Sequence, residues 1–263
     1  MTAVQGNKDI GVSLEGYVAT VEMRRPPNNF LDIELIDNLA TVLEALDEVT
    51  ECRAVVLCAE GKHFCAGANL QKRIDDEAAG KAIVRPRHLY HEARRLVSTR
   101  KPIVAAVHGS AIGAGLGLAL VADFRVTCKE SRLACNFAAL GYHPGFGMTY
   151  TLPRLVGHQM ARWLALTGRR VPGDEAVKIG LADRLADQEN VRKVAHEIAE
   201  ELTKIAPLSL QATRASLAHE LVSEFKAATE REAFEQVLLR ATNDFKEGVK
   251  ASSERREPNF TGS

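Results

Sequence analysis

The chain has 263 residues, with 34 basic and 34 acidic side chains and therefore no net charge. This balance gives no electrostatic reason to expect a nucleic acid or an acidic membrane surface as a partner. A hydrophobic fraction of 46% and a charged fraction of 26% are typical of a globular protein with one sizeable core. No apolar run is long enough to span a membrane, so no membrane partner is expected either.

The five cysteines form no CxxC pair, and several lie in apolar, strand-like runs. This pattern favours buried free thiols in a reducing compartment over a disulfide framework. The first residues have neither the apolar core of a secretory signal nor the arginine-rich pattern of a transit peptide. The expected location is therefore the cytoplasm.

The first half of the chain is predicted to alternate strands and helices. Strand-like runs at 10–14 and 17–23 flank Glu15-Gly16 and predict a hairpin. Asp32 is expected to cap a helix, because apolar residues recur at helical spacing after it. The polar stretch 69–84 predicts a short helix and a mobile loop. The other elements expected in this half are a strand at 54–57, a helix at 88–100 and a strand at 103–107.

The second half is predicted to end in helices only. Residues 136–151 are rich in glycine, proline and aromatic side chains, which predicts a shaped loop. The other expected elements are strands at 124–128, 132–135 and 182–185, helices at 152–156 and 159–166 around Gly157, a short helix at 174–179, and final helices at 191–206, 208–219 and 224–242. This order predicts an α/β core followed by a helical C-terminal part.

One apolar face of the final helices is predicted to need a partner, because a single helix cannot bury it alone. The apolar residues of this face are Leu221, Phe225, Ala228, Phe234, Val237 and Leu238.

The stretch VHGSAIGAGLGL, residues 107–118, is the most informative in the chain. It joins a buried strand to a helical segment through closely spaced glycines, among them Gly113 and Gly117. A strand, a glycine turn and a helix start together aim backbone N–H groups outward, where they can bind an anion or a developing oxyanion. A second glycine-containing loop, FCAGANL at 64–70, follows the strand predicted at 54–57.

These two loops resemble the two signatures of the enoyl-CoA hydratase/isomerase (crotonase) superfamily. The similarity extends to RPPNNFL at 25–31, to LGYHPG at 140–145 and to RREPNF at 255–260. The resemblance implies an α/β fold with a crotonase-like spiral core of ββα turns at 1–190. It also implies a C-terminal helical oligomerisation region at 191–263, and self-association as a trimer or as a hexamer of paired trimers.

The resemblance further implies that two backbone N–H groups, those of Ala68 and Ala114, form an oxyanion hole for a thioester enolate. Coenzyme A would enter as part of an acyl-CoA substrate and not as a cofactor. The residues expected beside this substrate are Pro27 and Asn28 near the adenine, Ala66, Asn69 and Leu70 along the pantetheine and adenine, Gly113 at the turn, and Phe260 from a neighbouring subunit.

The hydratases of the family use two glutamates as base and acid on either side of a water molecule. The matching positions here are Gly117 and Phe137, so the resemblance implies that both carboxylates are missing. Both residues are instead assigned to the acyl site. Isomerases of the family usually keep the second glutamate, so its absence also argues against isomerase activity.

Other side chains are candidates for proton transfer. Tyr142 and His143 lie on a loop where several relatives place a catalytic group, and a histidine suits proton transfer at neutral pH. The alternative is that both only shape the acyl pocket. Tyr90 begins the helix that lines the acyl pocket in relatives and is assigned to the substrate site, with packing favoured over catalysis as its role. His88 and His91 have no third ligand nearby in the sequence, so no metal site is expected.

Three functions remain open from the sequence. The first is an acyl-CoA enzyme that forms an enolate by decarboxylation, hydrolytic C–C cleavage or another lyase step; loop 136–156 also resembles that of decarboxylating relatives from polyketide β-branching pathways. The second is a hydratase or isomerase with atypical acid–base residues. The third is a non-catalytic homologue that binds acyl-CoA.

Overall fold

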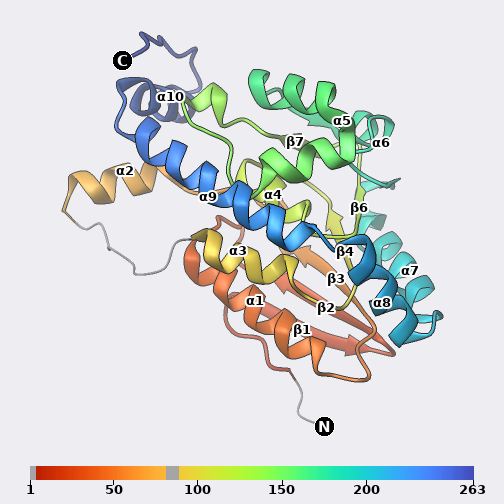
Figure 1. The fold of residues 1–263 in the computed structure, drawn as a ribbon. Helices are drawn as coiled ribbons and strands as arrows, with labels where there is room; N and C mark the ends of the chain where they lie inside the picture. Colours follow the sequence, from red (N-terminus) through yellow and green to blue (C-terminus); the bar gives the residue numbers. More distant parts are fainter. Residues whose placement is uncertain (1–3, 81–88) are drawn as a thin grey trace.

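The computed structural model describes residues 4–80 and 89–263, except for the side chains of residues 73, 77 and 78. Its centre is a six-stranded sheet in the order β1-β2-β3-β4-β6-β9 (Figure 1). The strands are β1 (Ile10–Glu15), β2 (Val18–Met23), β3 (Ala54–Ala59), β4 (Ile103–Val107), β6 (Phe124–Thr127) and β9 (Arg184–Leu185). Strands β1 and β2 form the predicted antiparallel hairpin, whereas the following strands pair in parallel.

Helices connect the parallel strands, as the alternating pattern predicts. They are α1 (Ile33–Asp47), α2 (Leu70–Ala78) and α3 (Leu89–Val97). Asp32 caps α1 as expected, because its Oδ1 accepts the backbone N–H of Leu35 at 2.8 Å. Residues 81–84 of the predicted loop and His88, where the next helix was expected to start, lie outside the described residues.

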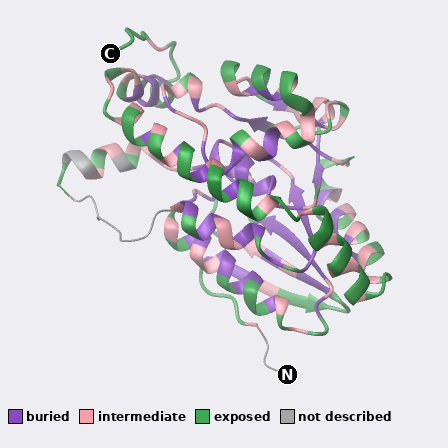
Figure 2. Ribbon diagram, in the orientation of Figure 1, coloured by how far each residue is buried: buried purple, intermediate pink, exposed green. Residues whose placement is uncertain are grey.

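The main sheet separates two hydrophobic clusters. In β3, Val55 and Leu57 belong to the larger cluster with α1 and α3, whereas Val56 and Cys58 belong to the smaller one. Helix α7 (Val191–Thr203) covers this second face with Val191 and two alanines. Figure 2 shows the resulting buried centre, with the exposed side of each outer helix facing away from it. Because α7 lies on the sheet, the C-terminal region begins as part of the core. The division at residue 190 stays a prediction.

A second, smaller sheet joins β5 (Ser110–Ile112), β7 (Arg132–Ala134) and β8 (Val171–Pro172). The sequence predicted only β7 of these three, because β5 lies inside the glycine-rich stretch and β8 has two residues. Helices α4 (Ala114–Ala119) and α6 (Gly173–Lys178) lie next to this sheet. The other elements of this region are η1 (Ala138–Leu140), α5 (Met148–Thr167) and η2 (Gln188–Asn190). Gly157 interrupts α5 with a φ of 76°, at the break that the sequence predicted.

Three helices follow α7: α8 (Pro207–Leu217), α9 (Leu221–Arg240) and α10 (Asn243–Glu254). Helix α9 lies against α3 and α5 (Figure 1). Helix α10 was not predicted from the sequence. Thr242 caps it by accepting the N–H of Phe245 at 3.1 Å. Among the helices of residues 4–80 and 89–263, none is long and apolar enough to cross a membrane.

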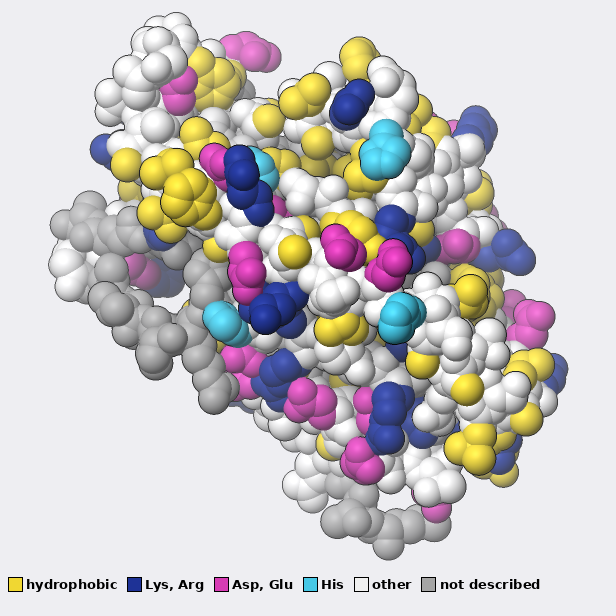
Figure 3. All heavy atoms as spheres, in the orientation of Figure 1, with side chains coloured by type: hydrophobic (Ala, Val, Ile, Leu, Met, Phe, Trp, Pro, Cys, Tyr) yellow, Lys and Arg dark blue, Asp and Glu magenta, His cyan; other side chains and the backbone are white. Residues whose placement is uncertain are grey.

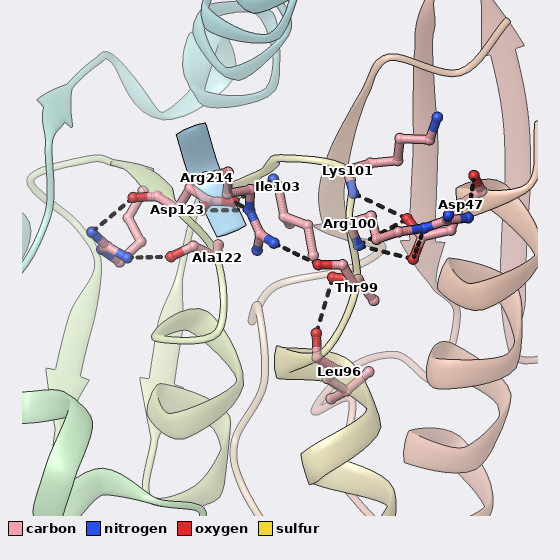
Figure 4. A network of polar contacts seen from close by, with 10 residues as sticks. Asp47, Leu96, Thr99, Arg100, Lys101, Ile103, Ala122, Asp123 and Arg214 are labelled. Atoms are coloured by element: carbon pink, nitrogen blue, oxygen red, sulfur yellow. Dashed lines mark hydrogen bonds and ion pairs between the residues drawn. The ribbon is translucent and has the colours of Figure 1, made fainter. Parts of the chain in front are cut away.

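The segment that leads into β4 is held from two sides (Figure 4). On one side, the carboxylate of Asp47 at the end of α1 accepts the N–H groups of Arg100 and Lys101. On the other side, Arg214 of α8 pairs with Asp123 at 2.8 Å and donates to the carbonyl of Thr99. These contacts fix the start of the strand whose far end leads to the glycine-rich turn.

Candidate active site

The two glycine-containing loops meet in space. The N–H of Cys65 donates to the carbonyl of Ser110, and the N–H of Ile112 donates to the carbonyl of Cys65, each at 3.0 Å. These bonds lay the loop after β3 beside β5. A Cβ built on Gly67 would lie 2.5 Å from the carbonyl oxygen of Ile112 and 3.6 Å from the nitrogen of Ala114. Position 67 therefore requires glycine, and the loops are in direct contact.

A glycine in an unusual conformation precedes each predicted oxyanion donor. Gly67 has a φ of 83° and Gly113 a φ of 55°, values that other residues rarely adopt. Within the described part of the chain, the N–H groups of Ala68 and Ala114 have no hydrogen-bond acceptor. Ala114 is also the first residue of α4, where the helix dipole adds partial positive charge. The structure thus brings the two predicted donors into one region and leaves both available.

Position 117 has no room for a side chain. A Cβ on Gly117 would lie 2.6 Å from the Cβ of Phe146, which is fully buried. Phe146 has a φ of 61°, a conformation that costs an aromatic residue on the order of 1–2 kcal/mol. Its ring packs edge-on against Phe225 of α9 at 6.5 Å. The space that a glutamate at 117 would need is therefore filled by Phe146.

Position 137 faces the same turn. The ring of Phe137 approaches the Gly113 position, with its Cζ 3.6 Å from where a Cβ would be. Tyr142 stacks on Phe137 at 6.4 Å between ring centres, and Phe245 of α10 contacts Tyr142 at 4.6 Å. Three aromatic rings thus form one wall beside the turn.

His143 is half-buried, and its Nδ1–H donates to the carbonyl of Pro144 at 2.7 Å. Its own carbonyl accepts the side-chain amide of Gln236 at 2.9 Å. In the described residues, no hydrogen bond joins its ring to Ala68 or Ala114. The structure therefore holds the backbone of His143 firmly, and the role of its ring stays a prediction.

Tyr90 fills the space beside Gly145. Its hydroxyl donates to Oε1 of Gln236 at 2.8 Å, and a Cβ on Gly145 would lie 1.8 Å from that hydroxyl oxygen. Burial raises the pKa of Tyr90 well above its usual value, so the hydroxyl stays neutral. Tyr90 is thus a neutral, buried and hydrogen-bonded side chain, and its role at the substrate site stays a prediction.

Glu232 of α9 is a buried residue of this region that the sequence motifs do not indicate. Its carboxylate accepts the N–H of Gly147 at 2.7 Å, the N–H of Thr149 at 2.9 Å and the Thr149 hydroxyl at 2.7 Å. It therefore caps the start of α5 from another helix. Burial raises the pKa of Glu232 to about 7, although these hydrogen bonds act in the opposite direction. Its place seven residues after the buried Phe225, on the same helical face, is a signal that sequence alone contains.

The residues predicted along coenzyme A lie near the loop after β3. Asn28 is half-buried, and its carbonyl accepts the N–H of Ala66 at 2.9 Å, whereas Pro27 is exposed. The Asn69 side chain accepts the N–H of Lys72 at 3.0 Å.

This bond places Asn69 as a cap of α2, and Leu70 is the first residue of that helix. Phe260 is 42% exposed on the C-terminal tail. Its predicted contact in a neighbouring subunit stays a prediction. No group of three potential metal ligands occurs within the described ranges, and His88 of the pair considered above lies outside them.

Comparison with known proteins identifies the family. The family model described as enoyl-CoA hydratase/isomerase matches residues 14–263. The chain belongs to this family, the crotonase superfamily. The 2,3-dehydroadipyl-CoA hydratase of Escherichia coli is 33% identical over 255 residues, covering 95% of this chain and 98% of that protein. The 1,2-epoxyphenylacetyl-CoA isomerase of the same organism is 30% identical over 257 residues, covering 95% and 97%.

A solved structure confirms the fold class. The crystal structure of an enoyl-CoA hydratase/isomerase from Pseudoalteromonas atlantica matches with a TM-score of 0.86 and 30% identity. The match covers 97% of this chain and all of that one. The predicted α/β crotonase fold with a C-terminal helical region is therefore confirmed, and the chain is a crotonase-family protein.

The raised pKa of Glu232 predicts a pH dependence of stability. Because the pKa is about 7 in the folded state and about 4.5 when unfolded, the folded protein binds more protons between these values. The contribution of Glu232 to the free energy of unfolding is thus largest below pH 4.5. It falls as the pH rises to 7, by on the order of 3 kcal/mol.

Urea unfolding of wild type and Glu232→Gln at fixed protein concentration, from pH 4.5 to 8, measures this difference. The free energy of unfolding of wild type should fall relative to that of Glu232→Gln as the pH rises. Glu224→Gln, at an exposed position of the same helix, serves as the control and should follow wild type. Parallel curves for wild type and Glu232→Gln would contradict the prediction.

Proposed function

We propose that the protein is an acyl-CoA enzyme that stabilises a thioester enolate with the N–H groups of Ala68 and Ala114. Its family membership and the two available donors support this proposal. An enolate carries its negative charge on the thioester oxygen, and preorganised donors in a site shielded from water stabilise that charge. The loss of one such donor costs on the order of 3 kcal/mol in the transition state.

The reaction we propose is a lyase step, decarboxylation or C–C cleavage. In decarboxylation of a malonyl-type thioester, the bond from the α-carbon to the carboxylate breaks and carbon dioxide leaves. The electron pair stays behind as the enolate, and the α-carbon then takes a proton. No protein carboxylate is needed to begin this sequence. The observation that carries the proposal is the Phe146 ring, which fills the space beside Gly117 where hydratases of the family have a glutamate.

We assign to Tyr142 or His143 the delivery of this proton to the α-carbon or the orientation of the leaving carboxylate. In neutral His143 the Nδ1–H is donated to the carbonyl of Pro144, so Nε2 is the atom that can take up a proton. Tyr142 belongs to the aromatic wall that includes Phe137. The alternative for both residues is pocket shaping alone.

A second candidate function is hydration or isomerisation of an enoyl-CoA with atypical acid–base residues. The names of the relatives favour it, because one of the two E. coli proteins is a hydratase and the other an isomerase. In this case Tyr142 or His143 would supply the groups that activate water or move a proton.

A panel of thioesters separates these functions. Purified protein is incubated with crotonyl-CoA, a malonyl-type CoA and a β-keto acyl-CoA, and the products are identified by mass. Because each positioned acid or base contributes about 10²–10⁴-fold, hydration of crotonyl-CoA should be several orders of magnitude slower than in relatives with two glutamates. Conversion of the malonyl-type or β-keto thioester should be the main reaction.

The same panel is repeated with His143→Ala and Tyr142→Phe. Each change should lower kcat more than it raises KM if the residue acts in the reaction. Efficient hydration that neither change affects would contradict the lyase proposal. Binding of acyl-CoA in calorimetry without any turnover would instead indicate a non-catalytic homologue.

We further propose self-association as a trimer or a hexamer. Of the apolar face predicted on the final helices, Phe225 points inward and is fully buried, whereas Phe234, Val237 and Leu238 are more than half exposed. Hydrophobic side chains also gather in several groups on the surface seen in Figure 3. Exposed apolar residues on one helix favour burial against another copy.

Light scattering at micromolar protein concentration tests this proposal. The expected mass is three or six times the 28.7 kDa of one chain. A mass equal to one chain would contradict it.

A further inference from the structure

Helix α9 buries three polar side chains, and two of them, Glu232 and Gln236, lie one turn apart and contact the same segment of the chain. Glu232 is fully buried and Gln236 is 7% exposed, whereas Phe234, Val237 and Leu238 on the other side of the helix face solvent. Buried glutamate and glutamine are uncommon unless they are hydrogen-bonded, because burial removes their contacts with water. The partners of these two side chains therefore indicate what they do.

Both side chains hold the same short segment, residues 143–149. Nε2 of Gln236 donates to the carbonyl of His143 at the start of the segment. Glu232 accepts the N–H of Gly147 and both donors of Thr149 at its end. The segment is thus fixed to α9 at two points, with Phe146 between them.

Phe146 is the residue that needs this support. Its positive φ is unfavourable for an aromatic residue, and such a conformation persists only when its surroundings determine it. The ring lies against Gly117 on one side and against Phe225 on the other. A segment that relaxed toward an ordinary conformation would move this ring away from Gly117.

Gln236 also links the segment to α3. Its Oε1 accepts the hydroxyl of Tyr90, while its Nε2 holds the carbonyl of His143. One amide therefore sets the position of Tyr90 relative to the segment that carries Phe146. Tyr90 also lies directly against the segment, because its hydroxyl occupies the space that a side chain at Gly145 would need.

We propose that Glu232 and Gln236 are positioning residues that hold Phe146 over Gly117 and thereby set which acyl groups the site accepts. The inference rests on the proposed function, since it takes the region beside Ala68 and Ala114 as the acyl site. Neither side chain needs to touch the substrate. Both act through the backbone of residues 143–149.

The test uses the full-length protein and three variants. Gln236→Met keeps the volume of the side chain and removes both hydrogen bonds. Glu232→Gln removes the carboxylate. Thr149→Val removes only the hydroxyl that donates to Glu232, so it gives a mild variant that is expected to fold. The matched control is Glu224→Gln, at an exposed position on the same helix.

Two measurements are made on each variant. Amide hydrogen exchange reports on the segment through the N–H groups of Gly147 and Thr149. Calorimetry gives the affinity for free CoA and for acyl-CoAs with a small and a branched acyl group. We expect faster exchange at both amides and a change in the ratio of the two acyl-CoA affinities by on the order of tenfold. The affinity for free CoA should stay within about twofold, since the residues predicted along CoA, such as Asn28 and Asn69, lie outside segment 143–149.

A double-mutant comparison makes the test specific to Phe146. Once Phe146→Ala has removed the ring, Gln236→Met and Thr149→Val should not change the acyl ratio any further. A ratio that changes equally in both backgrounds would overturn the proposal, because the two residues would then not act through Phe146. Unchanged exchange and an unchanged ratio in the single variants would also overturn it.

The proposed function can fail separately. If the wild-type protein binds acyl-CoA but converts none of the thioesters, the affinity ratios still decide the role of Glu232 and Gln236. If it hydrates crotonyl-CoA efficiently, the lyase step is wrong, while a changed acyl ratio in the variants still supports the positioning role.

Discussion

The pairing of the loop after β3 with β5 is the interaction on which the site depends. Two backbone hydrogen bonds from Cys65 and Ile112 place this loop against the glycine-rich turn. Ala68 and Ala114 are far apart in the sequence, and these bonds bring the loops that carry them together. The pairing also explains the glycine at position 67, since any side chain there would collide with the carbonyl of Ile112. A backbone contact between two loops thus brings together two available N–H donors, those of Ala68 and Ala114.

Aromatic side chains fill the space near these donors. Phe146 occupies the volume beside Gly117, Phe137 faces the Gly113 turn, and the Tyr90 hydroxyl occupies the volume beside Gly145. Two of these places, positions 117 and 137, are those where the resemblance implies a glutamate in hydratases of the family. The lyase step proposed above follows from this, because two backbone donors without a nearby carboxylate would favour reactions in which the substrate supplies the electron pair.

Local sequence signals predicted much of this protein. The cap at Asp32, the hairpin at Gly16 and the break at Gly157 depend on a few neighbouring residues, and the structure has all three. Both glycine loops could be assigned through their resemblance to a family. The family membership is now shown by the match over residues 14–263.

The features that sequence did not reveal depend on distant partners. Strand β8 is two residues long and exists because it pairs with β7. The left-handed conformation of Phe146 cannot be read from its neighbours, because Glu232 and Gln236 lie more than eighty positions away in the chain. Glu232 lies on a charged helix, where a glutamate is normally exposed, and its spacing from Phe225 is the one sequence signal for its burial. Its partners Gly147 and Thr149 are known only from the structure.

The most direct test of the account measures the thioester carbonyl itself. Infrared difference spectroscopy with a carbonyl-labelled acyl-CoA reports how strongly the bound oxygen is polarised. The account predicts a clear fall in the stretching frequency in the wild-type protein. It predicts a partial return toward the value in water in Ala114→Pro, which removes one N–H at a first helical position where proline is tolerated. A bound carbonyl with the frequency it has in water, or a fall that Ala114→Pro leaves unchanged, would contradict the account.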